Sequence, residues 1–205
     1  MPDSDPTAAP PPSADGLAAA AKSAAPRRGP APVHLWNPPF CGDLDMRIAR
    51  DGTWFYLGTP IGRMPLVKLF SSILKREGDR FFLVTPVEKV GITVDDAPFV
   101  AVDFAVEGTG RDQRLTFATH VDDTVTAGAD HPIRVSRDPV TGEPAPYVMV
   151  RSGLEALIDR KSFYRLVELC ETHPVAGTEQ VGLWSDGTFF PVMPAGELEA
   201  AVATS

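Results

Sequence analysis

The chain has 205 residues, of which 43% are hydrophobic and 22% charged, and its formal net charge is −8 at pH 7. This length suffices for one large domain or two small ones with buried cores. The acidic balance argues against sequence-independent binding to phosphate backbones or anionic lipid, so we expect neither nucleic acid nor membrane as a partner. No stretch reaches the roughly eighteen apolar residues of a membrane span, and no signal peptide is evident, which predicts a cytoplasmic protein.

The two ends of the chain are expected to differ from its middle. Ten of the 21 prolines and a run of alanines precede Phe40. Such a segment has too little apolar area to offset the entropy of ordering it, so residues 1–33 are predicted to be a disordered Ala/Pro-rich tail. Within it, Leu17–Ala25 is expected to form only a transient helix. Residues 196–205 are predicted to be a second, flexible tail.

Two cysteines, Cys41 and Cys170, stand alone in the sequence. No C-x-x-C pair or metal-ligand spacing accompanies them, so neither a disulfide framework nor a metal site is expected. Cys170 is predicted to lie on the buried face of the second predicted helix and to belong to the protein core rather than to act as a nucleophile. The sequence identifies no cofactor.

Between the tails, turn and strand signals predict two tandem α+β units, at 34–88 and 89–195. In the first unit, Asp51-Gly52 separates two strand-like segments and predicts a β-hairpin. A helix is predicted over Pro65–Arg76, because Pro opens it, apolar residues recur at helical spacing and Gly78 follows it.

The second unit is predicted to contain a hairpin of Val100–Val106 and Arg114–Val121. One register throughout, with Phe104 opposite Phe117, keeps the large side chains on one face. The other face then holds small or polar residues, namely Ala101, Asp103, Ala105, Thr116, Ala118 and His120.

Three sequence blocks recur in the same order. Arg47–Gly52 matches Arg134–Pro139, Ile61–Phe70 matches Ile158–Val167, and Phe81–Pro86 matches Phe189–Pro194. The recurrence predicts a duplicated unit of β-hairpin, helix and strand. The second helix is expected to have Ser162 as its N-cap and to stop before Pro174. Two small units are marginal alone, so we expect them to pack face to face around a cleft.

The repeat places Arg63 and Arg160 at equivalent positions, just before each helix. A positive side chain is unfavourable near a helix N-terminus, so its recurrence indicates an anion or a carboxylate close by. One interpretation is an ion pair with an aspartate such as Asp51 or Asp138 that braces each hairpin. The other is a bound anionic ligand.

The ligand interpretation defines a set of candidate binding residues at the cleft. Cations would hold the anionic group, aromatic rings would stack on a base, and one charged pair lies at the junction of the units. These candidates are Arg50, Arg63, Glu88, Lys89, Arg160, Trp54 and Tyr56. The alternative is that the aromatic rings belong to the core and the junction pair is solvated.

Four strings are longer than ordinary motifs: Leu35–Asp43, Asp51–Tyr56, Pro60–Arg63 and Thr85–Ile92. Together they resemble the bacterial family called domain of unknown function 1285, over about Val33 to Val192. The resemblance implies a duplicated α+β core, with a second half loosely similar to pleckstrin-homology folds. It also implies a nucleotide-like ligand at the domain interface and a role in signalling. No activity is established for the family.

We therefore expect a non-enzymatic protein that binds a small anionic, nucleotide-like ligand. Two other functions stay open. A hydrolase-type enzyme would need Asp103, His120 and Asp122 within hydrogen-bond reach of one another. The family that the chain resembles more usually has Asn where His120 stands, which argues against this role. A protein-interaction module would instead expose an apolar sheet edge.

Overall fold

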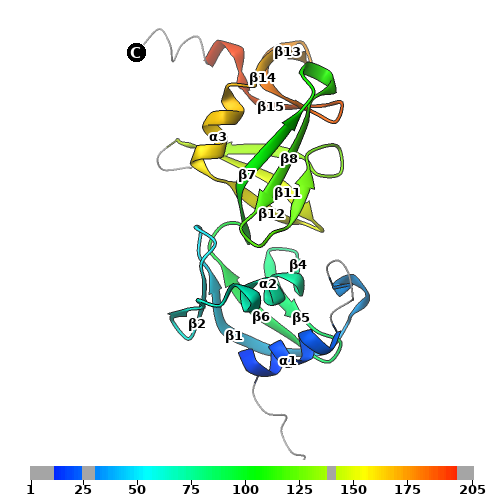
Figure 1. Cartoon of the computed structure of the whole chain (residues 1–205), viewed down its shortest axis with the longest axis vertical. Coiled ribbons are helices and arrows are strands. Elements are labelled where there is room, and N and C mark those ends of the chain that lie inside the picture. Colours follow the sequence, from blue (N-terminus) through cyan, green and yellow to red (C-terminus); the bar gives the residue numbers. More distant parts are fainter. Residues whose placement is uncertain (1–11, 25–30, 138–141, 198–205) are drawn as a thin grey trace, which may run out of the picture. The chain divides into compact units, whose positions relative to one another are not determined.

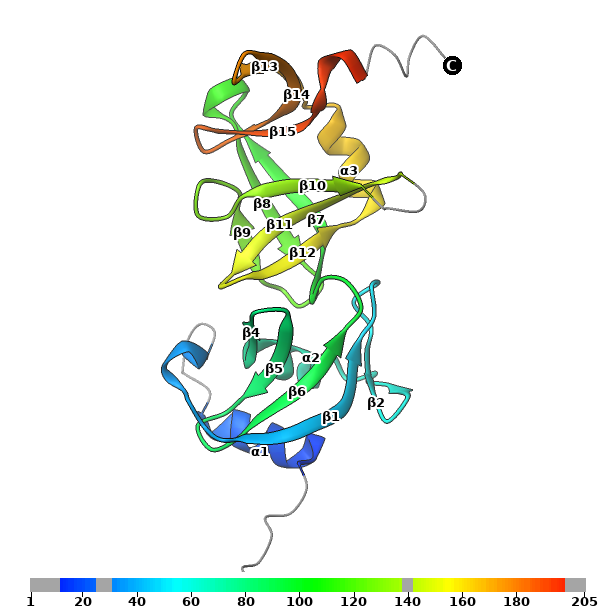
Figure 2. The same ribbon diagram turned by 180° about the vertical axis from the view of Figure 1, so that it is seen from behind.

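The computed structural model describes residues 12–24, 31–137 and 142–197, which divide into two strand-rich α+β units (Figures 1 and 2). The first unit contains the chain up to Ile48 and Thr53–Val94. The second contains Ala49–Gly52 and the chain from Asp95 onward. The predicted boundary at residue 88 is therefore too early, because the strand β6 (Lys89–Val94) belongs to the first sheet.

A six-stranded sheet in the order β3-β2-β1-β6-β5-β4 forms the first unit. Adjacent strands in this sheet are antiparallel, except for β1 and β6, which run parallel. The other strands are β1 (Phe40–Ile48), β2 (Trp54–Tyr56), β3 (Thr59–Pro60), β4 (Leu74–Glu77) and β5 (Arg80–Val84). The helices are α1 (Ala14–Ala24), the short 3-10 helix η1 (Val33–Leu35) and α2 (Met64–Ser72).

The core of this unit lies between the sheet and α2. Phe70 of α2 stacks on Trp54 of β2 with ring centroids 6.2 Å apart, and both rings are buried. Met46 and Ile48 of β1 are also buried. The predicted hairpin at Asp51-Gly52 is present, with Ile48 opposite Trp54.

Helix α1 lies within the segment that the sequence predicts to be a disordered tail. Leu17, Ala18 and Ala21 are buried on one face of α1, which packs on α2. The prediction is wrong for Ala14–Ala24, because these small side chains form an apolar stripe that a second helix covers. Residues 1–11, 25–30 and 198–205 lie outside the described residues.

Helix α2 is shorter than predicted. It ends at Ser72, and the residues from Leu74 to Glu77 form β4, which pairs with β5. Gly78, with φ of +60°, lies in the turn of this hairpin and is not a helix cap. Leu74 is buried in β4, and its position also continues the helical spacing of the apolar residues before it. Apolar spacing therefore does not distinguish a helix from a strand at this point.

The second unit has two sheets, one with the order β10-β11-β12-β7-β8-β9 and one with the order β13-β14-β15. The strands of the larger sheet are β7 (Phe99–Glu107), β8 (Arg114–Thr119), β9 (Thr124–Thr126), β10 (Ile133–Arg137), β11 (Pro144–Arg151) and β12 (Leu154–Ile158). The smaller sheet contains β13 (Glu171–Val175), β14 (Thr178–Ser185) and β15 (Thr188–Pro194). The helices are η2 (Gly110–Asp112) and α3 (Arg160–Val167), and α3 packs on β7.

A β-bulge interrupts the β7–β8 hairpin. The predicted register holds near the turn, where Phe104 faces Phe117. It then shifts by one residue, so that Ala101 faces Thr119 and both are buried. The predicted small-residue face is therefore wrong beyond the bulge, because an extra residue on one strand moves the following side chains to the other face.

The two six-stranded sheets share one topology. In the first sheet, the meanders β1-β2-β3 and β4-β5-β6 are joined by the parallel pairing of β1 with β6. In the second, β7-β8-β9 and β10-β11-β12 join through β7 and β12 in the same way. This repeat aligns differently from the three sequence blocks, since β10 occupies the place of β4 rather than that of β1.

The third pair of blocks shows most directly that the predicted alignment is wrong. Phe81–Pro86 lies on and after β5 of a six-stranded sheet, whereas Phe189–Pro194 lies on β15 of the separate three-stranded sheet. The helices also differ in place, because α2 connects two meanders and α3 follows the second of them. Short apolar strings recur wherever strands recur, so their order alone does not identify equivalent elements.

Candidate functional site

The candidate site is a surface pocket of about 360 Å³ in the second unit. It lies where the start of β11, the end of β12 and the first turn of α3 meet. Arg50, Glu143 and Arg160 contribute charged groups to its wall, and Phe163 and Tyr164 contribute aromatic rings. A pocket with a few charged groups and apolar walls is suited to a small anion that has a planar part.

Helix α3 positions three of these side chains. Arg160, Phe163 and Tyr164 are spaced i, i+3 and i+4, which places them on one face of the helix. The carboxylate of Asp159 accepts a hydrogen bond from the Ser162 backbone N–H at 2.7 Å and caps the helix. The predicted N-cap, Ser162, is therefore wrong, and the helix starts earlier because an aspartate precedes it at the right spacing.

The two arginines of the pocket each face a carboxylate. Nη2 of Arg160 lies 3.3 Å from Oε1 of Glu143, and these side chains are 71% and 63% exposed. Nε of Arg50 lies 3.2 Å from Oδ2 of Asp96. The Arg160–Glu143 pair is exposed and contributes little to stability, so a bound anion can take the place of the Glu143 carboxylate at small cost. Asp96 is only 22% exposed, so this argument does not extend to the Arg50–Asp96 pair.

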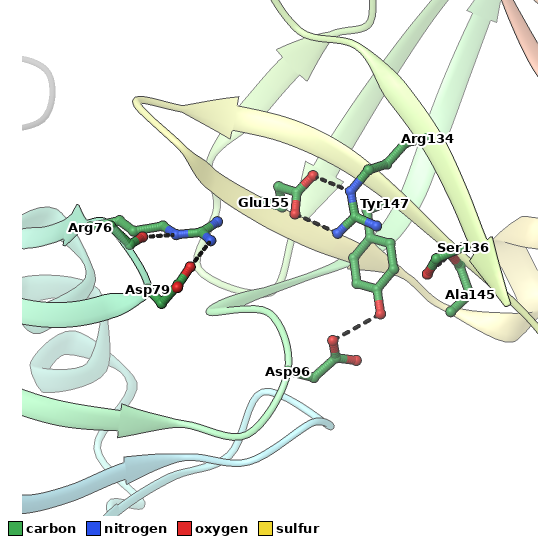
Figure 3. A network of polar contacts seen from close by, with 9 residues as sticks. Arg76, Asp79, Asp96, Arg134, Ser136, Ala145, Tyr147 and Glu155 are labelled. Carbon is green, nitrogen blue, oxygen red and sulfur yellow. Dashed lines mark hydrogen bonds and ion pairs between the residues drawn. The ribbon is translucent and has the colours of Figure 1, made fainter. Parts of the chain in front are cut away.

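A smaller pocket of about 290 Å³ lies next to the first and shares Arg50 and Ala145 with it. Tyr147 forms part of its wall. As Figure 3 shows, the Tyr147 hydroxyl donates to Oδ1 of Asp96 at 2.8 Å. Burial and the neighbouring carboxylate raise the pKa of Tyr147, so the phenol stays a neutral donor.

The guanidinium of Arg134 packs on the ring of Tyr147 and is held by Glu155. Arg134 lies over the Tyr147 ring at 4.1 Å and donates twice to Glu155, each time at 2.6 Å (Figure 3). The Glu155 carboxylate raises the pKa of Arg134. A bidentate contact of this kind holds the aromatic wall in place.

The structure brings together two of the predicted binding residues, Arg50 and Arg160. Arg63 lies in the first unit, beside a different pocket. Trp54 is only 1% exposed and stacks on Phe70, so its ring offers no face to a ligand. Tyr56 is half-buried.

The charged pair at the junction has partners within the first unit. Nζ of Lys89 lies 2.9 Å from Oε2 of Glu77. This contact, with Lys75, lowers the pKa of Glu77. Glu88 lies in a turn, where its backbone N–H donates to the Thr85 hydroxyl and burial raises the pKa of its side chain. Lys89 and Glu88 therefore have local structural roles.

The residues of the alternative enzyme hypothesis also have structural contacts. The Asp103 carboxylate accepts from Arg165 and from the backbone N–H of Phe104, and these contacts lower its pKa. Nδ1 of His120 accepts from the backbone N–H of Val100 at 3.1 Å. Burial lowers the pKa of His120, which favours the neutral ring. Asp122 is exposed in a turn with φ of +67°.

Several pocket residues lack a clear sequence signal. Glu143 lies on a connection, and Asp96 reads as an ordinary turn residue. The spacing of Arg160, Phe163 and Tyr164 is the one signal that could have identified this face. In the described part of the chain, no group of three or more His, Cys, Asp or Glu side chains could hold a metal ion.

The fold and the pocket define a two-domain α+β protein whose domains repeat one sheet topology. The chain belongs to the DUF1285 family: residues 31–97 match the "Domain of unknown function (DUF1285), N-terminal domain", and residues 98–192 match the "Protein of unknown function (DUF1285), C-terminal domain". The comparison with curated proteins found no match. Among the described helices, none has the length and apolar character that crossing a bilayer requires.

Two crystal structures of DUF1285 family proteins are similar to this chain. The protein from Silicibacter pomeroyi DSS-3 is 68% identical, with a TM-score of 0.83 over 91% of this chain and 100% of that one. The protein from Shewanella baltica OS155 is 30% identical, with a TM-score of 0.48 over 60% of this chain and 90% of that one.

Proposed function

We propose that the second unit binds a small anionic, nucleotide-like ligand without catalysing a reaction on it. The proposed site is the pocket at the start of α3. The observation that supports this most is the meeting of two arginines, Arg50 and Arg160, that are far apart in the sequence, at a pocket with aromatic rings.

The chemistry of the pocket favours a phosphate joined to a planar group. Guanidinium groups donate two parallel hydrogen bonds to phosphate or carboxylate oxygens. The rings of Phe163 and Tyr164 are half-buried and exposed, respectively, so they have surface on which a base could stack. The carboxylates of Glu143 and Asp96 hold the guanidinium groups when the ligand is absent.

A role in signalling and a pleckstrin-homology-like second half belong to the same proposal. Support comes from the order of the elements, in which β7–β12 precede α3. A module that binds a ligand without reacting with it would act in signalling by interacting differently with another molecule when the ligand is bound.

The test is thermal unfolding of the full chain with inorganic phosphate and with a panel of nucleoside mono-, di- and triphosphates. A ligand at a hundred times its dissociation constant should raise the free energy of unfolding by about 2.7 kcal/mol. Arg50→Ala and Arg160→Ala are expected to reduce the shift. Arg114→Ala is the control, because Arg114 is a similarly exposed arginine of the same unit that pairs with Asp186 away from this pocket.

Replacing the competing carboxylate provides a test in the other direction. In Glu143→Gln the guanidinium of Arg160 loses its acidic partner, so binding of the same nucleotide should become tighter by a few-fold. The proposal fails if no compound in the panel shifts the unfolding temperature, or if the shift is the same in Arg160→Ala and the wild type.

A further inference from the structure

A separate pocket of about 760 Å³ lies in the first unit, between α1 and the start of α2. Its walls are aliphatic: Ala18 and Ala19 come from α1, and Met64, Leu66 and Leu69 come from α2. Of the residues that the structure describes, no aromatic one lines this pocket. The volume lies within the range of pockets that enclose small molecules, which is about 300–1,000 Å³.

Two cations lie at this pocket. Lys22 and Arg63 are both exposed, and within the described residues neither has an ion-pair partner. One carboxylate, that of Asp15, also lines the pocket, in the first turn of α1. The local charge is therefore positive, although the whole chain is acidic.

Arg63 differs from Arg160 in its surroundings. Arg160 pairs with Glu143, and Asp159 caps the helix that Arg160 begins. Within the described part of the chain Arg63 has no such partner, and the first turn of α2 contains no acidic residue. An unpaired guanidinium beside aliphatic walls is complementary to a molecule with an anionic head and an apolar chain.

We propose that this pocket binds a monomeric medium-chain alkyl carboxylate. The alkyl chain would lie between α1 and α2, against Ala19, Met64 and Leu69, and the carboxylate would contact Lys22 and Arg63. Aliphatic walls without a stacking surface favour an alkyl chain over a base, which separates this ligand from the one proposed for the second unit. Methionine adapts its shape readily, so Met64 suits a flexible chain.

The experiment is calorimetric titration of the full chain with octanoate, decanoate and dodecanoate, each below its micelle concentration. Each methylene group removed should weaken binding by up to about fourfold. Dodecanol and dodecyltrimethylammonium have the same chain without the negative charge, and both should bind at least tenfold more weakly than dodecanoate.

Two variants locate the binding. Arg63→Ala removes an exposed cation and should weaken dodecanoate binding about tenfold. Ala19→Trp places an indole in the pocket from an exposed helix position and should abolish binding. Arg114→Ala is the matched control, because it removes an exposed arginine that pairs with Asp186 away from this pocket, and it should leave the affinity for dodecanoate unchanged.

Several outcomes would overturn this proposal. They are no binding of dodecanoate to the wild type, equal binding of the alkylammonium, or unchanged binding in Ala19→Trp. Attachment to phosphatidylglycerol vesicles without binding of the monomer would indicate a membrane surface instead. A dimer in light scattering that Ala19→Trp disrupts without any effect of dodecanoate would indicate a second copy of the chain. Failure of the nucleotide titrations has no bearing on this result.

Discussion

Gly52 illustrates how closely single residues are fitted in this protein. Its φ is +85°, and a Cβ atom there would lie 3.0 Å from Nε2 of His120 and 3.1 Å from Cγ2 of Val100. His120 is held in place, because its Nδ1 accepts from the backbone of Val100. A side chain at position 52 therefore has both an unfavourable backbone conformation and no room.

Gly52→Ala should lower the free energy of unfolding by more than the backbone conformation alone would explain. A positive φ costs an L-residue about 1–2 kcal/mol, and overpacking adds about 1–3 kcal/mol. Gly58→Ala is the matched control, since Gly58 has φ of +74° with nothing within 4 Å of a Cβ atom. Urea unfolding of both variants measures the difference. An equal loss of unfolding free energy in the two variants would show that the His120 side chain moves aside without an energetic cost.

The Gly52 turn itself is predictable from sequence, because Asp-Gly between two strand-like segments is a strong local signal. The contact of His120 with that turn is not. It depends on the bulge in β7–β8, which changes the face on which the residues beyond it lie, and a bulge leaves no mark in alternating hydrophobicity.

At the level of elements, the two helix N-termini differ in a way that links stability to binding. α3 begins with an aspartate cap, whereas α2 has Arg63 at the N-cap position with no side-chain hydrogen bond to the helix. The backbone of Arg63 is extended, with φ of −92° and ψ of +97°, which is the conformation of an ordinary N-cap.

Arg63→Asp should therefore stabilise the protein by about 0.5 kcal/mol, because it replaces a cation by an anion beside the positive end of the helix dipole. Side-chain capping adds little, because Pro65 has no N–H and the Leu66 N–H already donates to the carbonyl of residue 63. The same change should abolish dodecanoate binding. Arg63→Ala, which removes the cation without adding a cap, should weaken binding with little change in stability. Urea unfolding and calorimetry on the three proteins check this. A loss of stability in Arg63→Asp would contradict the helix-dipole argument.

The elements also show where sequence patterns end. Strand segments and their turns are predictable, as at Arg80–Val84, because apolar runs bounded by turn residues indicate strands. The end of α2 is not, because Ile73 and Leu74 are buried apolar residues, and apolar spacing of this kind fits the end of a helix as well as the start of a strand. The packing of α1 could not be predicted from composition, because it depends on the apolar surface of α2 against which α1 lies.

At the scale of the whole molecule, the repeated sheet topology explains why sequence blocks recur without aligning element by element. Both sheets need buried strands with the same alternation, so similar strings arise at positions that are not equivalent. The site was predictable only in part for a related reason. Arg50 and Arg160 could be selected by charge, but Glu143 and Asp96 became part of the site through the folding of connections.

Net charge gives the last prediction. The chain has a net charge of −8, so local guanidinium groups can hold one small anion while the molecule as a whole repels an extended phosphate backbone. We expect no saturable binding of a 20-base-pair DNA duplex below roughly 100 μM at physiological salt, which is the weak end of non-specific binding. Fluorescence anisotropy measures this, and repeating it at low salt is the control, because any attraction to the backbone strengthens as salt falls. Binding in the micromolar range with a steep salt dependence would show that the basic groups form a continuous surface. The arginines and lysines could then no longer be explained by small ligands bound in separate pockets.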